Sequence, residues 1–106
     1  MGKKITFVIP SRNNLEFLKL AYKSIRDLET EHEILILNDA SNDGTEKWMN
    51  DLQVSDKNLI AYHNPGPERI GIVGMFDRGI EMANTEIIMA FHADMVAGPD
   101  LDKYIL

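Results

Sequence analysis

Polar residues that can bind a ligand follow three apolar runs of this chain. The run at 5–9 is followed by Pro10-Ser-Arg12, the run at 34–37 by Asn38-Asp39, and the run at 87–91 by His92-Ala-Asp94. Residues two apart point to the same side of an extended backbone, so an imidazole and a carboxylate at that spacing can converge on one metal ion or on a ribose. Taken singly, each group also has a structural explanation: Asp39 can serve as a helix cap or an Asx-turn, and Arg12 as a solvated surface charge. Their shared position after three strands favours a common site.

The pattern of apolar residues predicts the elements that hold these groups. Apolar runs rich in β-branched residues indicate strands at 5–9, 34–37, 59–62 and 87–91, and the last is expected to be buried on both faces. Apolar residues at spacings of three and four predict three helices between them. The first follows Asn13 or Asn14, either of which can cap it; the second begins near 43 or 45; the third covers most of 71–84. A turn at 98–99 and a helical turn at 100–106 complete the predicted elements.

Alternation of strands and helices predicts a Rossmann-like α/β fold, with a parallel sheet and helices on both of its faces. With strand order 3-2-1-4, the first and fourth strands are neighbours where the winding reverses, and ligands bind at that point. The fourth strand then leaves one sheet edge unpaired, so we expect self-association through it. That edge and the apolar tail Tyr104-Ile-Leu106 suggest a single domain that is cut short.

Composition excludes several classes of partner. The chain has 106 residues, enough for one small domain, and a formal net charge of −6 without any cluster of Lys and Arg. This argues against a nucleic-acid groove and an anionic membrane surface. No apolar run reaches the ~20 residues of a membrane span or resembles a signal peptide. There is no cysteine, which fits a reducing compartment, so we expect a soluble, cytoplasmic protein.

The ordered motifs resemble those of the family 2 glycosyltransferases, which have the GT-A nucleotide-sugar fold. Phe7-Val-Ile-Pro-Ser-Arg-Asn13 resembles the family's first strand and its exit, and Leu35-Ile-Leu-Asn-Asp-Ala-Ser-Asn-Asp-Gly-Thr45 its second strand and the acidic loop after it. Gly79-Ile-Glu-Met-Ala83, the strand into His92-Ala-Asp94 and Gly98-Pro-Asp100 resemble its later helix, D-x-D region and turn. The likeness covers nearly the whole chain.

This resemblance implies roles for individual residues. Asp39 would accept a hydrogen bond from the ring N–H of a uracil or similar pyrimidine, with Pro10 and Arg12 beside the base. Asp94 would bind the divalent cation, Mn²⁺ or Mg²⁺, that bridges the two phosphates. The implied nucleotide-binding residues are Pro10, Ser11, Arg12, Asp39, Arg69 and His92, and the implied metal ligands are Asp94 and His92.

The sequence departs from the family pattern at two places. His92 stands where the first Asp of D-x-D is usual, and an imidazole there would favour Mn²⁺ over Mg²⁺. Asp77 and Arg78 stand where an Arg-Asn pair is common.

The implied reaction transfers a sugar from a nucleoside diphosphate sugar, expected to be a UDP-sugar, to the hydroxyl of an acceptor, which is a glycan, a lipid or a protein. A metal ion assists the transfer, and the configuration at the sugar carbon is inverted. The chain offers no convincing catalytic base, which we expect after Leu106, so the fragment alone is expected to be inactive. A receiver-like signalling domain is disfavoured because Pro10-Ser-Arg12 replaces the acidic pair it needs. A non-catalytic nucleotide-binding or regulatory module remains an alternative.

Overall fold

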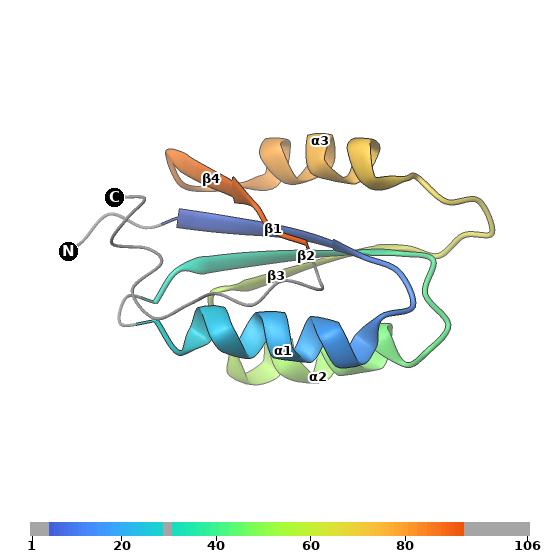
Figure 1. Cartoon of the computed structure of the whole chain (residues 1–106), viewed down its shortest axis with the longest axis horizontal. Helices are drawn as coiled ribbons and strands as arrows, with labels where there is room; N and C mark the ends of the chain where they lie inside the picture. Colours follow the sequence, from blue (N-terminus) through green and yellow to red (C-terminus); the bar gives the residue numbers. More distant parts are fainter. Residues whose placement is uncertain (1–4, 29–30, 93–106) are drawn as a thin grey trace.

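The computed structural model describes residues 5–28 and 31–92, in which four strands and three helices alternate (Figure 1). The elements are β1 (Ile5–Ser11), α1 (Leu15–Arg26), β2 (Glu33–Asp39), α2 (Thr45–Ser55), β3 (Leu59–Asn64), α3 (Ile72–Met82) and β4 (Ile87–Ala90). All paired strands are parallel, in the order β3-β2-β1-β4. The predicted α/β fold and its strand order are therefore confirmed. The turn at 98–99 and the helical turn at 100–106 lie outside the described residues.

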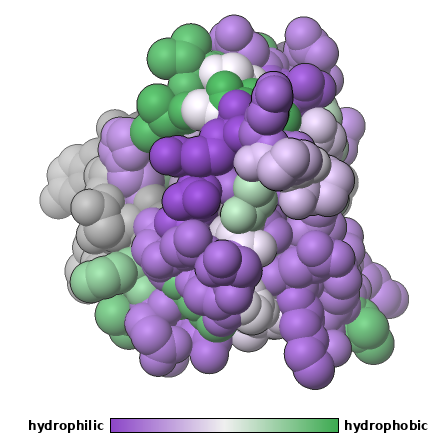
Figure 2. All heavy atoms as spheres, turned by 90° about the vertical axis from the view of Figure 1, so that its right-hand side faces the viewer, coloured by the Kyte–Doolittle hydropathy of each residue, from purple (hydrophilic) through white to green (hydrophobic). Residues whose placement is uncertain are grey.

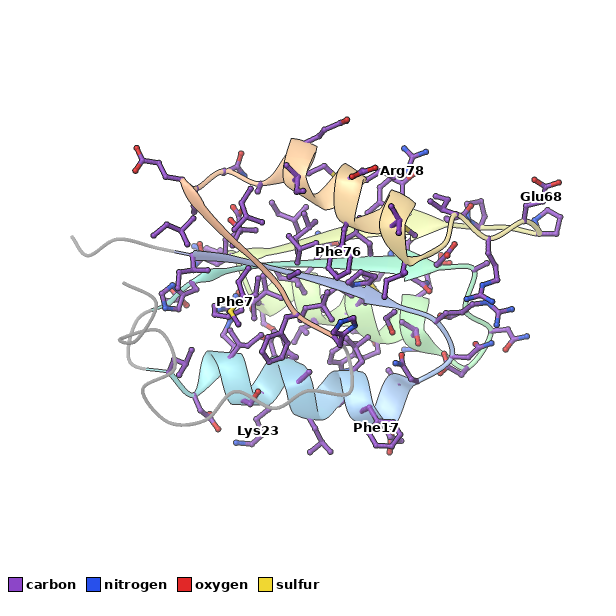
Figure 3. All side chains as sticks on the ribbon, turned by 45° about the horizontal axis from the view of Figure 1, so that its top comes forward. Phe7, Phe17, Lys23, Glu68, Phe76 and Arg78 are labelled. Carbon is purple, nitrogen blue, oxygen red and sulfur yellow. The ribbon has the colours of Figure 1, made fainter. Side chains whose placement is uncertain are left out.

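Helices cover both faces of the sheet, with α1 and α2 on one side and α3 on the other (Figure 1). Alternate residues of the central strands feed the two cores, because successive side chains of a strand point to opposite faces. Ile5, Phe7 and Ile9 of β1 pack toward α1 and α2, whereas Val8 packs toward α3 with Met75. Figure 3 shows Phe7 between the sheet and α1. Within the described part of the chain, no helix is long and apolar enough to span a membrane.

Helix α3 approaches β1 very closely at Gly79. A Cβ atom built on Gly79 would lie 2.3 Å from Cγ1 of Val8 and 3.3 Å from its Cβ. Any side chain at this position would separate the helix from the strand. The glycine therefore sets the height of α3 above the sheet, and with it the position of the helix's first turn.

The prediction that the fourth strand is buried on both faces is wrong. In β4, Ile87 and Met89 are partly buried, but Ile88 is 36% exposed and Ala90 is exposed as well. The reason is that β4 lies at the sheet edge, where α3 leaves a shallow apolar groove of about 240 Å³ beside Val8 and Ile88. The apolar residues of β4 therefore line two different surfaces: Ile87 and Met89 lie on the more buried face of the strand, and Ile88 and Ala90 line the open groove.

The predicted side-chain cap of the first helix is also wrong. Asn14 occupies the N-cap position of α1, but its side chain makes no cap hydrogen bond. Its Oδ1 accepts a hydrogen bond from the Ser11 hydroxyl instead. The N–H of Leu15 donates to Oδ2 of Asp43, at 3.0 Å, so the cap comes from a different loop.

Candidate functional site

A polar pocket of about 280 Å³ lies where β1 and β2 end and α3 begins. Figure 2 looks onto this end of the molecule, which is mainly hydrophilic, with hydrophobic atoms gathered near the top, where α3 lies. Parallel strands bring their carboxyl ends to one edge, and the pocket lies next to the junction of β1 and β4, where the winding reverses. The lining residues are Pro10, Ser11, Arg12, Asn14, Asp39, Arg69, Gly71, Ile72, Met75 and His92.

All six residues predicted to bind a nucleotide line this one pocket, although they come from four separate segments of the chain. Asp94 lies outside the described residues. Sequence reasoning missed Asn14, Gly71, Ile72 and Met75, the last three of which belong to the start of α3. The sequence cue for this end of α3 was Gly71, which stands directly before the periodic apolar residues of the helix. In the structure it occupies the N-cap with a φ of 89°, a conformation that favours glycine.

Asp39, the last residue of β2, is the most constrained polar group of the pocket. The residue is only 4% exposed. Oδ1 accepts hydrogen bonds from the Asn64 amide and from the N–H of Ile70, both at 2.8 Å, and Oδ2 accepts one from the N–H of Gly71, also at 2.8 Å. The carboxylate thus joins the ends of β2 and β3 to the N-terminus of α3.

The environment of Asp39 keeps it ionised. Burial alone would raise the pKa of its carboxyl, but the hydrogen bonds from Asn64, Ile70 and Gly71, together with the charge of Arg69, outweigh that effect and lower it. Asp39 is therefore ionised at neutral pH and can act only as a hydrogen-bond acceptor.

The acidic loop after β2 also holds the first loop in place. The N–H of Asn13 donates to Oγ of Ser41 at 3.0 Å, and the N–H of Asn42 donates to Oδ1 of Asn13 at 2.7 Å. Asp43 caps α1 from Oδ2, while its Oδ1 accepts hydrogen bonds from the N–H and hydroxyl of Thr45. The loops that carry Arg12 and Asp39 are therefore cross-linked into one unit.

His92 closes the pocket on the β4 side. Its ring is exposed and meets the ring of Phe76 edge to face, with centroids 6.0 Å apart and an interplanar angle of 88°. Within residues 5–28 and 31–92, no three His, Cys, Asp or Glu side chains lie together as a ready-made metal site.

The sheet and this pocket define a Rossmann-like α/β domain with a polar ligand site at its topological switch point. The family model described as glycosyl transferase family 2 matches residues 6–106. The chain belongs to this family.

Curated relatives include glycosyltransferases of bacteria and phages. The chain is 27% identical, over 93 residues, to the undecaprenyl-phosphate mannosyltransferase of Micrococcus luteus, a match covering 86% of this chain and 38% of that protein. It is 42% identical, over 61 residues, to the bactoprenol glucosyl transferase of Shigella phage SfX, covering 54% of this chain and 20% of that protein. The chain thus spans well under half the length of these relatives.

Solved glycosyltransferase structures have the same GT-A fold. A mannosyltransferase from Pyrobaculum calidifontis, in complex with GDP-Man and Mn²⁺, superposes with a TM-score of 0.75 at 19% identity, covering 91% of this chain and 29% of that one. TarS 1–349 from S. aureus, in complex with UDP, superposes with a TM-score of 0.80 at 15% identity, covering 96% of this chain and 31% of that one. These similarities establish the fold.

Proposed function

We propose that this chain is the donor-binding part of a glycosyltransferase and that its pocket holds a nucleoside diphosphate sugar. The observation that carries the proposal is the convergence of Arg12, Asp39, Arg69 and His92 on one pocket in a family 2 chain. Two arginines there supply the positive charge that an otherwise acidic protein needs beside a diphosphate.

The pocket divides into a base side and a phosphate side. Asp39 accepts the ring N–H of the base, and Pro10, Ser11 and Arg12 lie next to it along the exit of β1. Arg69 precedes the N-terminus of α3, whose N–H groups and dipole also favour negative charge. His92 lies against Phe76, near the ribose and the phosphates in this assignment.

A divalent cation, Mn²⁺ or Mg²⁺, fits the phosphate side of the pocket. His92 would hold it together with Asp94, and an imidazole ligand favours Mn²⁺. When bound, such a cation stabilises the charge that grows on the leaving diphosphate. The residues of the chain itself orient the donor and keep its base fixed while the sugar is transferred.

We place the catalytic base outside residues 1–106. Among the described residues, Asp39 is the one carboxylate that lines the pocket, and its hydrogen bonds commit it to the fold and the base. The greater length of the relatives leaves room for a base and an acceptor site. The 106-residue chain should then bind a donor without transferring its sugar.

Calorimetric titration with UDP, with and without Mn²⁺, tests the proposal. We expect binding that strengthens with Mn²⁺, and we expect Arg12→Ala to weaken it by about tenfold, the effect of one charged hydrogen bond. Lys23→Ala is the matched control, because it removes the same charge from an exposed site on α1 whose partner is Asp27.

An affinity for UDP that is the same with and without Mn²⁺ would favour the alternative, a non-catalytic nucleotide-binding module in which His92 has replaced a metal-binding acid. Absence of any nucleotide binding would refute the proposal.

A further inference from the structure

Asp39 has most of its acceptor capacity filled by its own chain. A carboxylate offers about four lone-pair positions, two on each oxygen. Oδ1 already accepts two hydrogen bonds, from Asn64 and Ile70, and Oδ2 accepts one, from Gly71. Among the described residues these are the hydrogen-bond partners of the carboxylate, so a single position, on Oδ2, remains for a ligand.

We infer that this single open position makes the pocket selective for uracil over guanine, and that Asn64 is the residue that enforces the selectivity. The inference rests on the proposed function, because it concerns the same pocket. Uracil presents one ring N–H between two carbonyl groups, so one acceptor satisfies it. Guanine presents a ring N–H and an adjacent amino group, and pairing both with a carboxylate requires an open position on each oxygen.

Asn64 is placed to keep Oδ1 closed. It is the last residue of β3, and its amide donates to Oδ1 of Asp39 and to the carbonyl of Glu68, both at 2.8 Å. Its Oδ1 accepts the N–H of Gly66 at 3.2 Å, which fixes the orientation of the amide. Guanine could use Oδ1 only by displacing this amide or the N–H of Ile70, and the displaced donor would be left without its partner.

Four nucleotides separate the possibilities on the unmodified chain. UDP should bind at least about tenfold more tightly than GDP, the effect of one unmatched polar group. N3-methyl-UDP, which lacks the ring N–H, should lose a similar factor against UDP. IDP, which is GDP without the amino group, should bind more tightly than GDP, because its single ring N–H leaves no unmatched donor at the carboxylate.

Equal binding of UDP and GDP, or GDP binding as tightly as IDP or more tightly, would overturn the inference while leaving the proposed function intact. Failure of all four nucleotides to bind, with and without Mn²⁺, would overturn both.

Substitution of Asn64 tests its role as a positioning residue. Asn64→Ala frees a position on Oδ1, so the ratio of UDP to GDP affinity should fall toward one, a change that mere loosening of the loop would not produce. Glu68→Gln is the matched control: it lies in the same loop, at its far tip in Figure 3, and its side chain does not contact Asp39. An unchanged affinity ratio in Asn64→Ala would overturn the role of Asn64, and the four-nucleotide comparison still decides the selectivity if that variant does not fold.

Discussion

Replacement of Gly79 by alanine should lower stability and weaken nucleotide binding together. The added Cβ would lie 2.3 Å from Cγ1 of Val8, where ordinary contacts begin at 3.4 Å, so α3 must move off β1 or distort. Val8 is buried and β-branched, so its side chain cannot swing away. Overpacking of this kind costs about 1–3 kcal/mol, and the better helix propensity of alanine returns about 1 kcal/mol. A 2.3 Å contact with a side chain that cannot move places the cost at the upper end of this range, so we expect a net loss of about 2 kcal/mol.

Urea unfolding followed by circular dichroism measures this loss, and calorimetry with UDP measures its effect on the pocket. Affinity should fall because Gly71, Ile72 and Met75 belong to the start of the displaced helix. Gly74→Ala is the comparison on the same helix: its added Cβ would lie 2.7 Å from Cγ2 of Ile70, a partly buried residue of the loop before α3, and not against the sheet. It should cost less stability than Gly79→Ala, because a loop residue can shift more readily than the buried Val8 of β1.

A double variant makes the reasoning refutable. Val8→Ala removes the atoms that clash, so Val8→Ala with Gly79→Ala should be more stable than the sum of the two single losses, by about 1–2 kcal/mol. Additive losses, or a Gly79→Ala variant as stable as the unmodified chain, would refute the claim that this contact sets the position of α3.

Three further predictions concern acidic residues. Asp43→Ala should cost about 1–2 kcal/mol in urea unfolding, because it removes the cap of α1 and the link between two loops; a loss below about 0.3 kcal/mol would contradict this. Asp56→Ala should cost about 3 kcal/mol in the same assay, because it leaves the largely buried Arg26 without its ion-pair partner, and a neutral effect would contradict it. Burial raises the pKa of the Asp39, Asp43 and Asp56 carboxyls, but the hydrogen bonds that each accepts outweigh burial and lower it. The unfolded chain therefore binds protons more readily than the folded one. Stability should therefore hold near neutral pH and fall as pH drops below the unfolded carboxyl pKa of about 3.9; unfolding free energies that stay constant from pH 5 to about pH 2 would contradict it.

The order and direction of the strands could be predicted because each apolar run is short and rich in β-branched residues, and because one helical pattern separates each run from the next. Strand ends were less predictable. β1 continues through Pro10 and Ser11, although a proline usually ends a strand. The backbone groups of Val8 point toward β4, because the Val8 carbonyl accepts a hydrogen bond from the N–H of Phe91. Pro10 lies two residues further along β1 and faces the same way, but β4 has already ended at Ala90. The N–H that proline lacks would therefore have no strand partner, so the sheet loses no hydrogen bond.

The meeting of Arg12, Asp39 and His92 in one pocket could be predicted because parallel strands share a carboxyl edge. The partners of Asp39 could not. Asn64 lies 25 residues away and Gly71 lies 32 residues away, and their contacts depend on the path of an irregular loop that no periodicity describes. Met75 is fully buried in the core, and its contact with the pocket depends on the position of α3.

The two walls of the pocket are fastened to the sheet in different ways. On one side, three backbone-to-side-chain hydrogen bonds lock the segments after β1 and β2 together, through Asn13 and Asp43. The opposite wall, 65–71, is fastened to the sheet mainly through one carboxylate and one amide. Ligand preference at this pocket should therefore diverge among related chains by remodelling of this second wall, which can change its length or sequence while the sheet and its first wall stay as they are.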